Sequence, residues 1–226
     1  GSTRAPLQPM DHAVMTFIPD ATALASFAVA SFVLAVTPGP DMVLFLSRTI
    51  AQGRKAGFAC MFGALTGIMI HTALVALGLA ALLAASPQAF AVLKLAGVAY
   101  LIFLAVQAVR NGSAPAIASG RSTYLGFSRN WRAGLAVNLL NPKVILFFLT
   151  FLPQFVAASD PHAAAKLAFL GLMFVAIGLC VCIGVILMAD RVALLLRRSP
   201  KASRALDWLF ASVFSAFAVK LMLARA

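Results

Sequence analysis

Two proline-centred segments inside long apolar runs hold the residues whose types and spacing could do chemistry. The first reads Thr37-Pro38-Gly39-Pro40-Asp41, and the second reads Asn138-Leu139-Leu140-Asn141-Pro142-Lys143. Proline removes a backbone donor and obstructs the preceding turn, so each segment predicts a break in a helix. Pro40 and Pro142 each suit the first position of a new half-helix, whose exposed N–H groups and positive dipole end would face the break.

Two such helix starts that converge inside a membrane protein would form a site for an anion, most simply a substrate carboxylate. The predicted substrate-binding residues are Thr37, Pro38, Gly39, Pro40, Asp41, Asn138, Asn141, Pro142 and Lys143. In one interpretation the polar side chains at this depth, Gln107 among them, line a cavity. In the other interpretation they satisfy the backbone groups that the breaks leave free.

Asp41 and Lys143 are ionisable residues well inside apolar runs, where charges are costly and usually functional. In the functional interpretation, Asp41 binds a substrate ammonium or carries a proton, and Lys143 contacts a carboxylate or a gate. In the structural interpretation, the two residues pair with each other, or Asp41 is stabilised by the dipole of the helix that starts beside it. The two interpretations are compatible, and the sequence leaves both open.

His71 shares one helix face with Gly63 and Gly67, because the three residues are spaced by four. Small residues let a neighbouring helix approach closely, so this face is predicted to point into the bundle. His71 is a candidate for proton coupling together with Asp41, because its unperturbed pKa is about 6.5. A histidine that is hydrogen-bonded within the bundle is the alternative.

Two further acids lie at the predicted inner boundary of the membrane. Asp190 stands beside Arg191, and Asp207 lies near Arg204. We interpret both acids as members of interfacial ion pairs or as gate contacts rather than as substrate ligands. Asp190 is the predicted gate residue.

No group of residues predicts an enzyme or a metal site. Cys60, Cys180 and Cys182 lie inside apolar runs, and no His or Cys neighbour completes a metal-ligand spacing. The sequence has no evident nucleophile and base pair and no Gly-x-x-x-x-Gly-Lys motif for ATP. We therefore predict no enzymatic activity, no metal and no cofactor, and an ion gradient as the source of energy.

The composition places both proline segments in a membrane. Of the 226 residues, 62% are hydrophobic and 11% are charged, and the mean hydropathy is +0.99. A soluble domain carries about 25% charged residues, so this chain is too poor in charge to face water all round. The net charge of +12 would suggest nucleic acid in a soluble protein, but here the basic residues fill short gaps between apolar runs. The predicted partner is therefore membrane lipid and not nucleic acid.

Six apolar runs are long enough to cross a hydrocarbon core, which takes about 20 residues. They cover residues 21–47, 57–84, 90–109, 133–156, 164–189 and 206–223. Most of the basic residues lie in the first, third and fifth gaps. By the positive-inside rule these gaps are cytoplasmic, and both termini lie outside.

A Gly- and Ser-containing linker, residues 111–132, divides the chain into two halves, 21–110 and 133–225, with three spans each. Because three is odd, the second half enters the membrane in the opposite orientation. Interrupted segments at matching positions of two such halves point to a binding site in transporters. We predict an all-α integral membrane protein with six transmembrane helices in two inverted three-helix repeats, with helices 1 and 4 broken. Residues 10–226 form one transporter domain, and residues 1–9 are interpreted as a remnant of an expression tag.

The two proline segments, taken together at this spacing, resemble those of the LysE/RhtB family of amino-acid exporters. Further similarity lies in residues 57–79 with His71, in Ala99-Tyr100-Leu101, in Phe148 and in Phe151-Leu152-Pro153-Gln154-Phe155. The resemblance extends from about Ala30 to the C-terminus. It implies efflux of amino acids from the cytoplasm of a bacterium, across the inner membrane, powered by the proton gradient.

We therefore expect a secondary transporter that exports amino acids by proton antiport with alternating access. Neutral substrates of the homoserine and threonine type are favoured over basic ones, because Asp41 is the single acid deep in an apolar run and a doubly cationic substrate would prefer two. The alternatives are an exporter of another small solute or cation, or a channel-like pore, which would need a more polar lining. A homodimer is among the assemblies that the sequence leaves open.

Overall fold

The computed structural model describes residues 18–79, 122–157 and 160–191 continuously, with isolated positions between 92 and 110 and between 194 and 219. Throughout this described part, the regular elements are helices, which confirms the predicted all-helical class. The α-helices are α2 (Ala21–Val36), α3 (Pro40–Gln52), α4 (Arg54–Leu74), α7 (Phe127–Leu139), α8 (Pro142–Leu146) and α9 (Ala163–Leu187). Two π-helical segments, η1 (Val75–Leu79) and η2 (Phe147–Phe151), and a 3-10 segment, η3 (Leu152–Phe155), extend α4 and α8.

Two helices of the described chain are long and apolar enough to cross a membrane, and four stretches are if each of two bent helix pairs counts as one span. Two are continuous, Arg54–Gly78 and Ala163–Leu187. The other two are bent pairs, Ala21–Val36 with Pro40–Gln52 at 48° and Phe127–Leu139 with Pro142–Phe155 at 51°. The predicted breaks at both proline segments are thereby confirmed. The predicted third and sixth spans fall where only isolated positions are described.

The first break follows from the two prolines that flank Gly39. The N–H and the hydroxyl of Thr37 both donate to the carbonyl of Val33, at 3.1 and 2.6 Å, and close the last turn of α2. Pro38 offers no N–H and forces the residue before it out of the helical region, so Thr37 is extended. Pro40 then occupies the first position of α3, as predicted.

The second break also has a proline at the start of its second helix, but the backbone that precedes this proline differs. Leu140 leaves the helical conformation, and Asn141, which precedes the proline, is extended. The side-chain oxygen of Asn141 accepts a hydrogen bond from the backbone N–H of Lys143 at 3.1 Å and so caps α8. Pro142 occupies the first position of α8, as predicted.

Helix ends differ from the predicted span ends wherever basic residues are involved. α3 continues through Arg48 to Gln52, beyond the predicted end of the first span at residue 47. α7 begins at Phe127, so Arg129 and Arg132 lie on a helix rather than in the predicted linker. Hydropathy marks the apolar part of a span, whereas arginine is a good helix former that extends a helix into the interface.

The π and 3-10 segments after α8 were not predicted. The helix changes to π geometry at Phe147–Phe151 and to 3-10 geometry at Leu152–Phe155. Pro153 lacks the N–H that a regular α-helix needs at this point, so the sequence did carry a signal for an irregular end.

Glycines let α4 and α7 pack with their backbones in contact. A Cβ on Gly63 would lie 1.9 Å from the carbonyl oxygen of Trp131, and Gly134 makes the reciprocal approach to the backbone of α4. A Cβ on Gly67 would lie 2.5 Å from Oδ1 of Asn138. The glycine face of α4 therefore points into the bundle, as predicted, and it fixes the position of Asn138.

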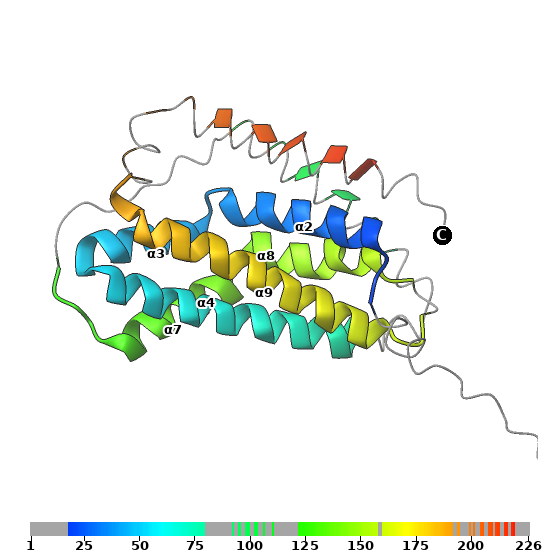
Figure 1. The fold of residues 1–226 in the computed structure, drawn as a ribbon, viewed down its shortest axis with the longest axis horizontal. Helices are drawn as coiled ribbons and strands as arrows, with labels where there is room; N and C mark the ends of the chain where they lie inside the picture. Colours follow the sequence, from blue (N-terminus) through cyan, green and yellow to red (C-terminus); the bar gives the residue numbers. More distant parts are fainter. Residues whose placement is uncertain are drawn as a thin grey trace, which may run out of the picture.

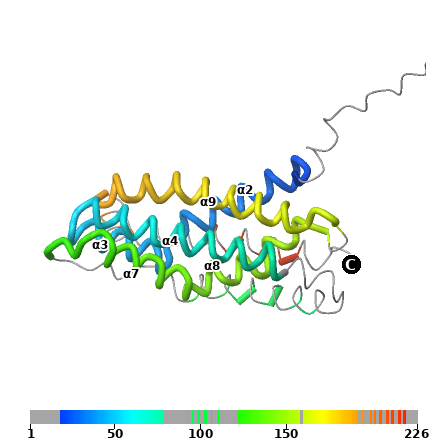
Figure 2. The backbone as a smooth tube through the Cα atoms, turned by 90° about the horizontal axis from the view of Figure 1, so that it is seen from below, coloured from blue at the N-terminus to red at the C-terminus, as the bar shows by residue number. Residues whose placement is uncertain are grey.

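The helices that contain the two breaks run in opposite directions (Figure 1). In this view α2 and α3 run from right to left, α4 returns, α7 and α8 run from left to right, and α9 returns. The first and fourth spans thus run in opposite directions. Figure 2, turned by 90°, shows the same helices lying along the long axis of the bundle. The starts of α3 and α8 consequently meet near the middle of the described helices.

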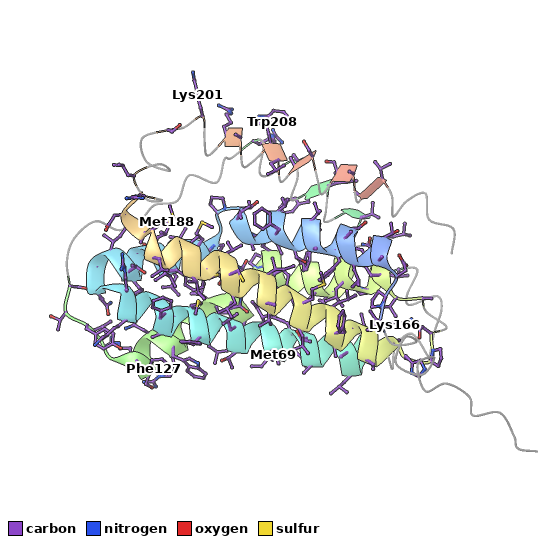
Figure 3. The ribbon with its side chains drawn as sticks, viewed as in Figure 1. Met69, Phe127, Lys166, Met188, Lys201 and Trp208 are labelled. Carbon is purple, nitrogen blue, oxygen red and sulfur yellow. The ribbon has the colours of Figure 1, made fainter. Side chains whose placement is uncertain are left out.

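Polar and apolar side chains are distributed as expected for a protein in a bilayer. Phe32 is 52% exposed and Met69 is 44% exposed, whereas Asn130 and Asn138 are fully buried. Figure 3 shows Met69 on the outer side of α4. Exposed apolar side chains are favourable against lipid, and polar groups at membrane depth must be satisfied inside the protein. The described bundle is therefore that of a membrane protein.

Candidate functional site

A cavity of about 70 Å³ lies where the two breaks meet, with room for several water molecules. Its polar wall comes from both breaks and consists of Thr37, Gly39, Asp41, Asn138, Asn141 and Lys143. The structure thus brings together the six predicted substrate-binding residues that are not proline. The three prolines, Pro38, Pro40 and Pro142, shape the breaks without lining the cavity.

Asp41 extends from α3 to the second break. Its Oδ2 atom accepts hydrogen bonds from Nδ2 of Asn138 at 2.9 Å and from Nδ2 of Asn141 at 3.1 Å. Its Oδ1 atom is buried and has no hydrogen-bond partner among the described residues. One oxygen of the carboxylate is therefore anchored, and the other is available to a proton or a ligand.

Lys143 extends in the opposite direction, from α8 to the first break. Its Nζ donates to the backbone carbonyl of Thr37 at 2.8 Å. The side chain passes Gly39 so closely that a Cβ there would lie 3.4 Å from Nζ. The charges of Lys143 and Asp41 also attract each other. Each of the two charged side chains bridges to the opposite break.

Helix dipoles stabilise both charges where they lie. The carbonyl of Thr37 is at the C-terminal, negative end of α2, which favours the Lys143 ammonium. Asp41 is in the first turn of α3, at the positive end of that helix. The two breaks thus hold a cation and an anion at membrane depth, where an uncompensated charge would be costly.

The two half-helix starts are not equally open. Gly39 precedes α3 and offers no side-chain cap, whereas Asn141 caps α8. α8 is also short, with five residues before the π segment. We predicted exposed N–H groups at both helix starts; at the start of α8 the Asn141 side chain already accepts from the N–H of Lys143.

His71 lies behind the second break and does not line the cavity. Its ring centroid is 5.9 Å from that of Phe148, and the imidazole is within hydrogen-bond reach of the Asn138 backbone. Its Nε2 atom is buried without a partner in the described part of the chain, and a protonated imidazole there would attract the Asp41 carboxylate. His71 thus contacts the backbone of the residue that holds Asp41.

Asp190 lies apart from this cavity, in a second hollow of about 450 Å³ at one end of the bundle, which Gln52, Arg54 and Ser122 also line. Asp190 and Arg191 are both described, and no ion pair joins these two residues. The role of Asp190 as an ion-pair or gate residue stays a prediction. Gln107 and Asp207 lie outside the described residues.

A polar junction at the same end was not predicted. The Oε1 atom of Gln52 accepts from the backbone N–H of Leu125 at 3.0 Å and from Nδ2 of Asn130 at 3.2 Å. Nearby, the Arg54 guanidinium donates to the carbonyl of Leu187 at 3.0 Å. These bonds tie the ends of α3 and α9 to the starts of α7 and α4. The fully buried amide of Asn130 was the available signal, but its partner is distant in sequence.

Two membrane spans broken around a buried cavity, which charged and amide groups line, define the site architecture of a membrane transporter. The LysE type translocator family matches residues 32–225 of the chain. The chain belongs to this family of transporters.

Two of three similar proteins carry efflux functions in their names. A homoserine/homoserine lactone efflux protein of Salmonella typhimurium is 32% identical over 200 residues, which cover 88% of this chain and 96% of that protein. An uncharacterized membrane protein of Vibrio cholerae is 30% identical over 89% of this chain and 97% of its own length. A leucine efflux protein of Salmonella choleraesuis is 24% identical over 87% of this chain and 92% of that protein. No solved structure matches the chain.

Proposed function

We propose that this protein exports neutral amino acids from the cytoplasm in exchange for protons. The similar efflux proteins are named for homoserine, its lactone and leucine. These three compounds share an α-ammonium group, and the lactone lacks a free carboxylate. The group that a common site must recognise is therefore the ammonium.

The observation that carries the proposal is the half-anchored carboxylate of Asp41. Two amides of the second break hold Oδ2, and Oδ1 has no partner among the described residues. A substrate ammonium and a proton would compete for this oxygen. Because the two ligands exclude each other, release of one permits binding of the other, which is the requirement for exchange. His71, behind Asn138, is the candidate second group on the proton route.

The substrate carboxylate, where there is one, would bind on the other side of the cavity. Lys143 supplies a charge-assisted contact, and the uncapped start of α3 supplies a positive dipole end. A zwitterion would lie with its ammonium toward Asp41 and its carboxylate toward Lys143. Among the described residues, the polar wall offers a single carboxylate, which favours a neutral side chain over a second cation.

The arrangement of the helices supports alternating access by two inverted halves. The first and fourth spans run in opposite directions, α4 packs against α7, and α9 packs against α2. If the two halves are interchanged, α4 takes the place of α9 and α7 takes the place of α2, so each of these two contacts maps onto the other. Arg48, Arg54 and Arg129 belong to the end where α3 ends and α7 begins. We assign that end to the cytoplasm and both chain termini to the outside of a bacterial inner membrane.

Counterflow in proteoliposomes tests the proposal. The purified protein is reconstituted with unlabelled homoserine, threonine, leucine or lysine inside, and the uptake of the same labelled compound is measured. Neutral amino acids should exchange, and a matched carboxylic acid that lacks the amine should not compete. Protein-free liposomes are the control. If none of the amino acids exchanges, the protein is not an amino-acid exporter.

A further inference from the structure

The cavity has a second wall that is almost entirely apolar. The broken spans supply its charged and amide groups, whereas the two continuous helices, α4 and α9, supply apolar side chains, one cysteine and one glycine. From α4 these are Met61, Ala64, Leu65 and Ile68; from α9 they include Phe174, Gly178, Val181 and Cys182. A ligand held by its charged groups at the breaks therefore has an apolar surface opposite.

Gly178 is the opening in this wall. It is buried, yet a Cβ built on it would meet no atom of the described residues within 4 Å. Gly171, on the same helix, is the opposite case, because a Cβ there would lie 2.3 Å from Cγ2 of Thr72. Gly171 is needed for helix packing, and Gly178 leaves space inside the protein.

Phe174 borders that space with a fixed ring. It lies four residues before Gly178, hence on the same face of α9. Its ring is 5.1 Å from Phe147 and 5.4 Å from Phe148, centroid to centroid, the latter edge-to-face. Three aromatic rings from two helices therefore hold one side of the opening in place.

We propose that Gly178 and Phe174 form the subsite for the substrate side chain, and that the missing side chain at Gly178 sets the largest side chain transported. The inference rests on the proposed function, because it requires that the ammonium binds at Asp41. An apolar or small uncharged side chain fits this wall, whereas a charged one would be buried without a partner. The class of substrate is thus a neutral amino acid whose apolar side chain grows toward Gly178.

Size-graded counterflow tests the subsite. Gly178→Ala and Gly178→Val narrow the space by one and by three carbon atoms. Gly184→Ala and Gly184→Val are the matched controls, because a Cβ on Gly184 also meets no atom within 4 Å in the described part of the chain and Gly184 does not line the cavity. Exchange of alanine and of leucine is measured for each variant. We expect Gly178→Val to lower the leucine-to-alanine ratio about 10-fold or more, Gly178→Ala to lower it less, and both Gly184 variants to leave it unchanged.

An unchanged ratio in both Gly178 variants would overturn the subsite, and so would an equal fall in the Gly184 variants. If Gly178→Val does not fold, Gly178→Ala decides the question with a single added methyl group. Wild-type protein that exchanges no amino acid refutes the proposed function itself. If the wild type exchanges amino acids and the Gly178 variants keep its size preference, only the subsite is refuted.

Discussion

The first break, between α2 and α3, and the second, between α7 and α8, each place a proline at the start of a helix and a charged residue directly after it. The charges are opposite, Asp41 in the first and Lys143 in the second, and each side chain bonds to the other break. The first break has no side-chain cap, whereas Asn141 caps the second. The two breaks thus differ at their helix starts: the first is open in the sense that no side chain caps α3, and the second is closed by the cap from Asn141.

The helices that follow the breaks differ as well. α3 is regular over 13 residues, whereas α8 gives way after five residues to π and then 3-10 geometry. Hydrogen-bond geometry is poorer in such segments, and π segments are frequent at functional sites. α3 therefore carries Asp41 on a regular helix, whereas the helix that carries Lys143 becomes irregular within two turns.

The largest expected effect comes from the charge in the open break. Asp41→Asn keeps the size of the side chain but cannot exchange a proton, so we expect it to abolish efflux driven by a pH gradient while slow substrate exchange persists. Both activities are measured in proteoliposomes. Asp160→Asn is the control, because Asp160 lies before the start of α9, outside the spans, and the hydrogen bond from Lys166 lowers the pKa of its carboxyl, so that Asp160 carries no proton near neutral pH. Normal gradient-driven efflux by folded Asp41→Asn protein would make Asp41 a structural residue.

The positions of the breaks could be predicted from the sequence because proline acts locally. Pro40 and Pro142 lack an N–H whatever surrounds them, so their effect on the helix needs no knowledge of the fold. The partial burial of Asp41 and Lys143 followed from their place in apolar runs. The resemblance to the exporter family, confirmed by the family match over residues 32–225, rested on the same two segments.

The contacts between the breaks could not be predicted, because they depend on how closely distant helices approach. Lys143 reaches Thr37 alongside Gly39, and Asn138 reaches Asp41 because glycines bring α4 against α7. The apolar wall was missed for another reason. Phe174 and Gly178 are ordinary residues of an apolar helix, and only the space around them distinguishes them.

A smaller effect is expected from the charge in the closed break. Lys143→Met removes the charge-assisted contact to a substrate carboxylate, which is worth about 1.5–3 kcal/mol. We expect the apparent KM for amino acids to rise about 10-fold or more, whereas the apparent KM of the corresponding amides should change little because they carry no carboxylate. Competition assays on the same preparation measure both. An equal rise for amino acids and amides would assign Lys143 to holding the two breaks together.

The smallest effect is expected from alanine at the capping position of each helix start, and it compares the two starts directly. Asn141→Ala removes the cap of α8 and the hydrogen bond from the Asn141 side-chain amide to Asp41. We therefore expect it to lower the free energy of unfolding by about 1–2 kcal/mol. Gly39→Ala removes no side-chain bond, and the φ of −161° at Gly39 is extended backbone that alanine adopts freely. Its Cβ would lie 3.4 Å from the Lys143 ammonium, a tight contact that a small shift of the flexible lysine relieves. Gly39→Ala should therefore melt close to the wild type in detergent and show a modest rise in apparent KM, while Asn141→Ala should melt at a clearly lower temperature. Equal loss of stability in the two variants would mean that the first break also depends on its capping residue, and the distinction between an open and a closed break would not hold.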